Sequence, residues 1–252
     1  MVIKESEIRY MEDALLIENK ILVLGDFHIG YDKLIEKEFF PKIQFKEIIK
    51  KLERIFRLLV KENIIVKQII VLGDLKHEFG EISNIEWNEG LKLLDYLDTK
   101  IDVGYGGDRI VLIKGNHDNF LENIASKRSI KVKDSYKIKN ICFMHGDKLF
   151  ESCLDRVDIL VIGHLHPAIT LKDNYKGEKY KCFLRGMWKR KLVYIVPSFN
   201  PVNFGFDLSL DFSKNNFKFI INKRYLKKFK IIIYNPKEDK EYCFGNVEKL
   251  IR

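Results

Sequence analysis

Five short blocks of this 252-residue sequence place glycine beside aspartate, asparagine or histidine. In chain order they are Gly25-Asp26-Phe27-His28, Gly73-Asp74, Gly115-Asn116-His117-Asp118, His145-Gly146-Asp147 and Gly163-His164-Leu165-His166. Their side chains offer oxygen and nitrogen donors without sulfur. Such a set suits manganese, iron or zinc, and it holds too much nitrogen for an ordinary magnesium or calcium site. The blocks therefore predict a metal centre.

The number of donors predicts two metal ions rather than one. A single ion takes about four to six ligands. Seven residues qualify here: Asp26, His28, Asp74, Asn116, His145, His164 and His166. Two ions that share one carboxylate would use them all, as in two-metal phosphatases and nucleases. The Asp-x-His and His-x-His spacings agree, because residues i and i+2 of an extended segment point to the same side.

Each block follows a short apolar run that is typical of a buried strand. The runs are Ile21–Leu24, Gln68–Leu72, Ile110–Ile113, Ile138–Met144 and Ile159–Ile162. Apolar residues at helical spacing predict helices over Gln44–Lys61 and Glu86–Leu97, and Ile8–Ile17 is typical of an opening hairpin. Glycine with a polar residue also makes ordinary turns, but five such blocks in order are not explained that way. Because strand ends of an open α/β sheet gather at one edge, where ligands bind, we expect the blocks to meet there.

The second half of the chain lacks long helical patterns. We expect strands over Lys179–Leu184, Leu192–Val196, Phe206–Asp211, Phe217–Ile221 and Phe229–Tyr234. The first half is thus predicted to be α/β and the second mostly β. No repeat or linker divides the chain, so we expect a single domain over residues 1–252. Its motif-bearing part is residues 21–203, followed by a mostly β C-terminal extension at 204–252.

Taken in order, the five blocks resemble the calcineurin-like metallophosphoesterase superfamily over residues 25–166. The resemblance implies an α/β fold, a four-layer αββα sandwich of two mixed β-sheets flanked by helices. It also implies that Asp74 bridges two divalent metal ions, one held by Asp26, His28 and His166 and the other by Asn116, His145 and His164. A metal-bridging water or hydroxide would then attack phosphorus.

The same resemblance assigns two residues near the reacting phosphate. His117 would stabilise the developing charge or protonate the leaving oxygen, and Asp118 would either orient His117 or complete the turn. Manganese is the expected metal, with iron, nickel and zinc as alternatives. The resemblance therefore predicts a metal-dependent phosphoesterase, a hydrolase acting on ester bonds.

Two segments are similar to a narrower group, the DNA ligase- and helicase-associated phosphoesterases of archaea and bacteria. They are Gly73–Phe79 and Pro197–Pro201. The similarity implies a phosphodiesterase or nuclease acting on nucleic acid in DNA repair, with a functional association with DNA helicase or ligase. One alternative is a phosphatase or pyrophosphatase acting on small nucleotides. Another is a catalytically inactive scaffold, which the intact His117 disfavours.

Two further residues, in the segments Gly73–Phe79 and Pro197–Pro201, each have two possible roles. His77 either supports a metal ligand or contacts substrate. Asn200 either faces the site or belongs to a loop whose prolines only make it rigid.

Composition limits the class of protein further. The chain is 46% hydrophobic, so it can bury a core, and no uncharged stretch free of proline is long enough to span a membrane. We therefore expect a soluble, cytoplasmic protein without a membrane partner; no oligomeric state is predicted. The net charge of +9 is compatible with nucleic acid as a partner. Lysine supplies 35 of the 45 basic residues, so part of this charge is a general compositional bias.

Cysteine and the basic residues give three more expectations. The four cysteines form no Cys-x-x-Cys pair and are expected to be reduced thiols: Cys142, Cys153, Cys182 and Cys243. The basic residues of the helix at 44–61, Lys51 among them, are expected on a solvated face. The segment Arg185–Lys191 combines Trp188 with basic residues, which suits a contact to single-stranded nucleic acid or a hairpin turn, and we favour the hairpin.

Overall fold

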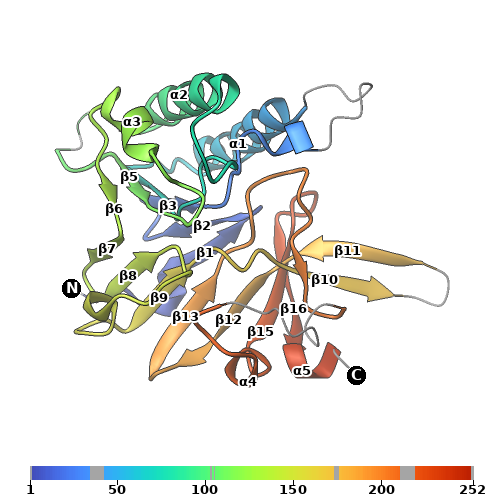
Figure 1. Ribbon diagram of the computed structural model, residues 1–252. Coiled ribbons are helices and arrows are strands. Elements are labelled where there is room, and N and C mark those ends of the chain that lie inside the picture. The colour runs from blue at the N-terminus through green and yellow to red at the C-terminus, as the bar shows by residue number, and fades with distance from the viewer. Residues whose placement is uncertain are drawn as a thin grey trace.

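The parallel strands that precede the glycine blocks are four residues long and fully buried, so both of their faces must be covered. A computed structural model describes residues 2–34, 43–102, 104, 106–172, 176–210 and 219–250. In it, a six-stranded sheet has the order β1-β2-β3-β4-β5-β6 (Figure 1). Its strands are β1 (Ile8–Met11), β2 (Ala14–Ile17), β3 (Ile21–Leu24), β4 (Gln68–Val71), β5 (Ile110–Ile113) and β6 (Val132–Lys133). The β1–β2 and β2–β3 pairs are antiparallel, and the remaining pairs are parallel.

A second, seven-stranded sheet has the order β16-β15-β12-β13-β9-β8-β7. Its strands are β7 (Ser135–Ile138), β8 (Ile141–Met144), β9 (Ile159–Ile162), β12 (Phe183–Trp188), β13 (Lys191–Ile195), β15 (Lys230–Asn235) and β16 (Lys240–Asn246). A small third sheet has the order β11-β10-β14. It contains β10 (Pro167–Lys172), β11 (Gly177–Lys181) and β14 (Phe206–Asp207). The C-terminal strand β15 pairs with β12, so the end of the chain completes the second sheet.

Helices cover the outer face of the six-stranded sheet, and the outer side of the seven-stranded sheet is covered differently (Figure 1). The first face carries α1 (Gln44–Lys61), α2 (Asn84–Asp98) and α3 (Leu121–Ser126). The second is covered by the small sheet with α4 (Lys223–Leu226) and α5 (Val247–Leu250). Three 3₁₀ turns, η1 (Glu5–Glu7), η2 (Tyr31–Leu34) and η3 (Glu151–Cys153), complete the described helical elements.

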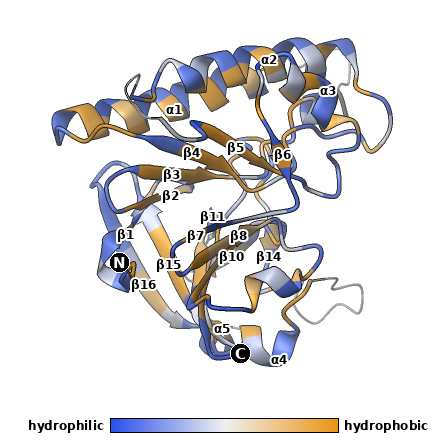
Figure 2. Ribbon diagram, turned by 90° about the vertical axis from the view of Figure 1, so that its left-hand side faces the viewer, coloured by the Kyte–Doolittle hydropathy of each residue, from blue (hydrophilic) through white to orange (hydrophobic). Residues whose placement is uncertain are grey.

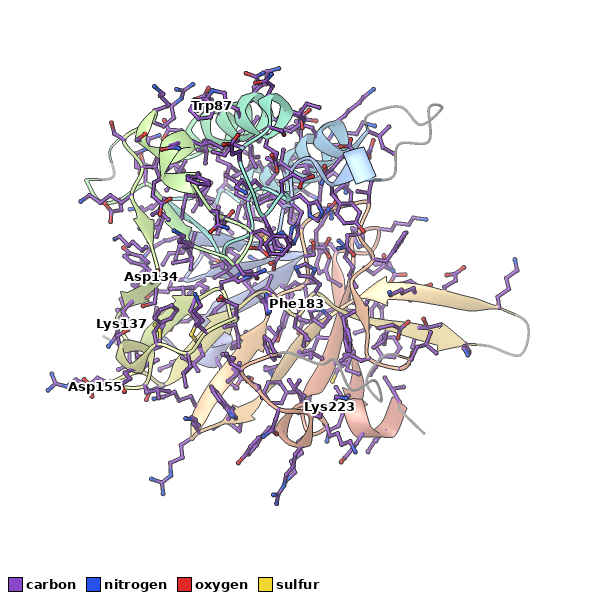
Figure 3. The ribbon with its side chains drawn as sticks, in the orientation of Figure 1. Trp87, Asp134, Lys137, Asp155, Phe183 and Lys223 are labelled. Carbon is purple, nitrogen blue, oxygen red and sulfur yellow. A yellow bond between two sulfur atoms is a disulfide. The ribbon has the colours of Figure 1, made fainter. Side chains whose placement is uncertain are left out.

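Alternation along the strands divides the interior into three apolar layers. In β3, Leu22 and Leu24 face the helices, whereas Ile21 and Val23 face the second sheet. Phe183 of β12 lies in this middle layer between the sheets, while Lys223 and Asp155 lie at the periphery (Figure 3). Figure 2 shows hydrophobic residues concentrated in the strands of the two large sheets. Because successive side chains of a strand point to opposite faces of the sheet, each buried strand supplies apolar side chains to two of these layers.

Most elements agree with the sequence analysis. The mixed α/β fold is confirmed, and α1 has the predicted bounds. The outer layer of the second sheet differs, because short helices and a small sheet replace the expected flanking helices. Of the strand predicted at Phe206–Asp211, only the first two residues form β14, and residue 211 lies outside the described residues. Residues 217 and 218 of Phe217–Ile221 also lie outside them, and residues 219–221 form no strand.

Two expectations about side chains are wrong. Cys142 and Cys153 form a disulfide, because β8 and η3 bring their Cα atoms to 5.4 Å. Cys182 and Cys243 are free thiols. Lys51 is only 8% exposed, because it lies three residues after the buried Ile48 and thus on the apolar side of α1.

The basic segment near Trp188 forms the favoured hairpin. β12 and β13 pair through Trp188 and Lys191, and the Trp188 side chain is buried. Arg185 forms an ion pair with Glu5 at 2.5 Å, so this cation is not free for a phosphate. Within the part of the chain that the structure describes, no helix is both long and apolar enough to cross a membrane.

Candidate metal centre

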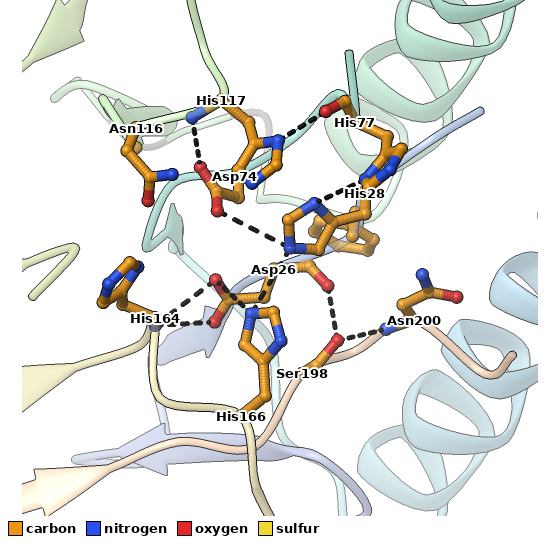
Figure 4. Close-up of polar contacts among 12 residues, drawn as sticks. Asp26, His28, Asp74, His77, Asn116, His117, His164, His166, Ser198 and Asn200 are labelled. Atoms are coloured by element: carbon orange, nitrogen blue, oxygen red, sulfur yellow. Dashed lines mark hydrogen bonds and ion pairs between the residues drawn. The ribbon is translucent and has the colours of Figure 1, made fainter. Parts of the chain in front are cut away.

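Residues from both large sheets meet at one site. The carboxyl ends of β3, β4 and β5 lead into Asp26 and His28, Asp74 and Asn116, whereas those of β8 and β9 lead into the remaining histidines. Figure 4 shows most of these side chains gathered around Asp74 and Asp26: His28, Asn116, His164 and His166. The structure thus brings together all seven predicted ligands: Asp26, His28, Asp74, Asn116, His145, His164 and His166.

The first cluster consists of Asp26, His28 and His166. The ligand atoms of these residues and of Asp74 all lie within 4.8 Å of one another. His28 Nε2 lies 3.3 Å from His166 Nε2 and 3.5 Å from Asp74 Oδ2. His166 Nε2 lies 3.0 Å from Asp26 Oδ1. Two imidazoles and two carboxylates therefore point at one position.

The second cluster consists of Asn116, His145 and His164. His145 Nε2 lies 3.0 Å from Asn116 Oδ1 and 3.0 Å from His164 Nδ1. It also lies 3.3 Å from Asp74 Oδ2, the same oxygen that His28 approaches. Asp74 Oδ2 therefore lies between the two clusters, within reach of donors from both.

The backbone at the first cluster and at the bridging residue is not extended. Asp26, His28 and Asp74 have φ values of 55°, 46° and 50°, and His164 and His166 have 64° and 49°. These left-handed conformations are uncommon for residues with a side chain and cluster at functional sites. The Asp-x-His and His-x-His segments are therefore not extended, contrary to the prediction, although the residues of each pair do lie at the same metal centre.

Two glycines allow the close approach of neighbouring segments. A Cβ atom at Gly115 would lie 2.1 Å from Asp74 Oδ1, and one at Gly163 would lie 2.6 Å from Asp26 Oδ2. Any side chain at these positions would displace a predicted ligand.

Surrounding hydrogen bonds orient the ligands as a metal requires. His145 Nδ1 donates to Leu72 O at 2.8 Å, which leaves Nε2 as the ring nitrogen directed into the site. The His117 amide donates to Asp74 Oδ1 at 2.9 Å and leaves Oδ2 for the bridging position. Neutral imidazoles with two carboxylates form a donor set that fits divalent transition metals.

Burial and charge set the protonation of these groups without metal. Burial, with His166 nearby, lowers the pKa of His28 to about 3. Burial, with His145 nearby, lowers the pKa of His164 to about 4. Burial alone would also lower the pKa of His145, but Asp74 and Asp26 outweigh it and raise the pKa to about 10. A proton on His145 therefore supplies positive charge where a cation fits.

His117 lies beside the two clusters, but its side chain has no described contact with Asp74 Oδ2. Its Nδ1 hydrogen-bonds the carbonyl oxygen of His77, so Nε2 is the nitrogen left for a proton transfer. Asp118 bonds backbone instead: its carboxylate accepts from the amides of Gly115 and Leu75, both at 2.9 Å. Burial and the charge of Asp74 raise the pKa of Asp118 to about 7. Of the two roles left open for Asp118, these bonds are those of a residue that completes the turn.

The two residues with open roles lie next to the ligands. His77 Nδ1 is 3.4 Å from His28 Nδ1, and its backbone carbonyl bonds His117. Asn200 is fully buried, and its Oδ1 accepts from the Val202 amide at 3.1 Å. Its Nδ2 has no hydrogen-bond partner among the residues that the structure describes.

Sequence reasoning missed two residues beside the site. The Phe79 ring lies 3.7 Å from the His117 ring, centroid to centroid, and Phe79 is 57% exposed. Ser198 Oγ donates to the Asp26 carbonyl at 2.8 Å. Both lie in segments singled out from the sequence, Gly73–Phe79 and Pro197–Pro201, so their position was the available signal.

Comparisons with known proteins agree with this geometry. A family model described as calcineurin-like phosphoesterase matches residues 19–220. Among solved structures, the chain is similar to nuclease MPE from Pseudomonas putida, with 18% identity, 94% of each chain covered and a TM-score of 0.57. It is less similar to Yfce, a phosphoesterase from E. coli, with 12% identity, coverage of 90% of this chain and 98% of Yfce, and a TM-score of 0.38. No curated protein matches the chain.

Proposed function

Because the chain belongs to the calcineurin-like phosphoesterase family and is a metal-dependent hydrolase, we propose that it cleaves phosphodiester bonds in nucleic acid at two divalent metal ions. The single observation that carries the binuclear part is the position of Asp74 Oδ2. It lies 3.5 Å from His28 Nε2 of the first cluster and 3.3 Å from His145 Nε2 of the second. One carboxylate shared by two sets of donors supports two ions rather than one.

In this proposal, the residues of the site either hold a metal ion or transfer a proton. Two bound divalent ions would acidify water and neutralise charge on the phosphate. Asp26, His28 and His166 would hold one ion, and Asn116, His145 and His164 the other. His117, fixed through Nδ1 by the His77 carbonyl, presents Nε2 as the group that protonates the leaving oxygen. Asp118 supports this arrangement through the turn that carries His117.

A nucleic-acid substrate has three sources of support. The nuclease MPE shares the fold over 94% of both chains. The net charge of +9 favours a polyanion. Phe79 exposes an aromatic ring directly beside His117, where a base next to the cleaved phosphate could stack.

The activity is tested with two synthetic esters in the presence of Mn²⁺. We expect turnover of bis-p-nitrophenyl phosphate to exceed that of p-nitrophenyl phosphate. A preference for the monoester would favour the alternative phosphatase, and turnover of neither ester by metal-loaded protein would contradict the proposal. Cleavage of single- and double-stranded DNA then tests the polymer, and a flat dependence of DNA affinity on salt would count against it.

We further propose manganese as the metal and a cytoplasmic role in DNA repair alongside a helicase or ligase. The donor set supports manganese but equally accommodates iron, nickel and zinc, so reconstitution with each ion is the test. The repair role rests on the resemblance of Gly73–Phe79 and Pro197–Pro201. Cells lacking the protein should survive DNA damage poorly, and unchanged survival would contradict that role.

A further inference from the structure

The loop Pro197–Pro201 holds the backbone of the metal-ligand candidate Asp26 (Figure 4). Ser198 Oγ donates to Asp26 O at 2.8 Å, and the Asn200 amide donates to the same oxygen at 3.3 Å. The Phe199 amide donates to Gly25 O at 2.9 Å. Asp26 has a φ of 55°, so its left-handed conformation depends on contacts that over-determine it.

Two lysines from distant segments hold this loop in turn. Lys181 Nζ donates to Ser198 O at 2.6 Å and also to Asn200 O. Lys51 Nζ donates to Phe199 O at 3.3 Å and lies 4.8 Å from the centroid of the Phe199 ring. Three successive carbonyls therefore each accept from an ammonium group. Lysine suits this task because its ammonium carries three donors.

Asp13 supplies the charge that lets both lysines lie here. Its carboxylate pairs with Lys51 Nζ, and Oδ2 lies 3.8 Å from Lys181 Nζ. The Lys51 and Lys181 side chains are only 11% and 13% exposed. Burial lowers the pKa of Lys181 to about 7, against the effect of Asp13. Burial would raise the pKa of Asp13, but the two lysines outweigh it and lower that pKa.

Burying two cations and one anion costs free energy unless the charged groups form hydrogen bonds and ion pairs. An apolar side chain of similar length would fill the same space without losing the hydration of an ammonium group. Here the two ammonium groups donate hydrogen bonds to carbonyls of the loop Pro197–Pro201, and the loop donates hydrogen bonds to the Asp26 carbonyl. The residues Asp13, Lys51 and Lys181 are called the lysine clamp below.

We propose that the lysine clamp positions Asp26, through the loop Pro197–Pro201, for one of the two metal ions of the proposed centre. The inference rests on the proposed binuclear function. Asp26 is a ligand candidate of the first cluster and reaches the second only as a neighbour, because its carboxylate accepts from the His164 amide at 3.1 Å and lies 3.7 Å from His145 Nδ1. Loss of the clamp should therefore weaken binding of one ion more than the other.

The test is calorimetric titration of the metal-free, full-length chain with Mn²⁺ alone. Lys181→Met should lower the affinity of one site by about tenfold or more, as removal of supporting contacts does in other metal sites, and affect the second site less. Lys191→Met is the matched control. Lys191 Nζ also donates to a loop carbonyl, that of Val157 at 2.6 Å, but at the opposite end of β9.

Thermal unfolding of the metal-free variants separates positioning from general stability. Equal loss of stability in Lys181→Met and Lys191→Met, with weaker Mn²⁺ binding only in the former, supports the clamp. If Lys181→Met does not fold, Lys51→Met removes one carbonyl bond to the loop together with the Asp13 ion pair, and it should show a smaller loss at the same site because Lys181 still bonds two loop carbonyls. Unchanged affinity at both sites in a folded clamp variant overturns the inference.

The outcomes also separate the clamp from the proposed function. Wild-type protein that binds two Mn²⁺ ions without cleaving phosphodiesters contradicts the function, while the effect of Lys181→Met on binding still decides the clamp. Active wild-type protein with unaltered binding in the clamp variants contradicts the clamp alone.

Discussion

The two clusters of the metal centre are held by different kinds of contact. The second cluster is held by direct contacts between strand ends of the two large sheets: His145, after β8, donates through Nδ1 to Leu72 O, after β4, and the His164 amide, after β9, donates to the Asp26 carboxylate. The first cluster depends on side chains from distant elements. Gln44 of α1 donates to His28 O at 2.7 Å, and the lysine clamp acts on Asp26 through the loop Pro197–Pro201.

This difference shows how one half of a site can be held by the strand ends that carry it, while the other half also needs more distant elements. The contacts of the second cluster form when the two large sheets pack against each other. Bonds from α1, β11 and the loop after β13 form only when those elements are packed together. Substitutions far from the metal centre should therefore act more strongly on the first cluster than on the second.

The largest effect is expected where the clusters are joined. Asp74→Ala removes the oxygen common to both, so turnover of bis-p-nitrophenyl phosphate should fall by about a thousandfold or more, because metal ions supply several kcal/mol of stabilisation. The exposed Asp155 provides the control Asp155→Ala, which should retain full activity. Substantial metal-dependent turnover in Asp74→Ala would show that the clusters do not depend on a shared carboxylate.

The variant His117→Ala should separate proton transfer to the leaving group from metal binding at the two clusters. In His117→Ala, Mn²⁺ stoichiometry should be unchanged, because the His117 side chain makes no described bond to a ligand side chain. Cleavage of an ester with a poor leaving group should fall by about a hundredfold or more. Release of p-nitrophenolate, which needs little protonation, should change far less. An equal loss on both leaving groups would contradict the role of His117 as an acid.

Proton competition should distinguish the clusters by pH. His145, with a pKa of about 10, is protonated in the metal-free site at neutral pH, and a metal must displace that proton. Affinity at the second cluster should therefore fall about tenfold per unit as pH is lowered from about 9 to about 7.5, a range that lies above the ordinary pKa of an imidazole. His28, with a pKa of about 3, stays neutral throughout that range. Mn²⁺ titrations across it should show one strongly pH-dependent site, and equal dependence at both would refute this assignment.

Phe79 should affect substrate binding without affecting either cluster. Phe79→Ala should raise KM for single-stranded DNA by about fivefold or more, the loss expected for one stacked base, with kcat little changed. Phe244→Ala is the control, since Phe244 is 38% exposed on the edge strand β16. Unchanged KM in Phe79→Ala would mean that the ring only covers His117.

The ligands could be predicted because their signal is local. A buried four-residue strand followed by glycine and a polar residue, as at Leu24 to Asp26, states both where the strand ends and which side chain lies there. Helix α1 was predicted with its bounds for the same reason, since its apolar spacing is continuous over eighteen residues.

The supports of the first cluster could not be predicted in this way. Lys181 and Ser198 are distant from Asp26 in sequence, and nothing local relates them. Lys51 did carry a signal, because it is spaced three residues after Ile48 and four before Ile55 on the buried stripe, yet its charge suggested a solvated face. The Cys142–Cys153 disulfide likewise depends on how η3 packs against β8, which spacing alone does not show.

The central claim is that two clusters sharing Asp74 hold two metal ions. Titration of the metal-free chain with Mn²⁺, followed by electron paramagnetic resonance, tests it most directly. Two bound equivalents with a magnetically coupled spectrum, lost in Asp74→Ala, are the predicted result. A single bound equivalent, or two ions whose spectra show no coupling, would contradict it.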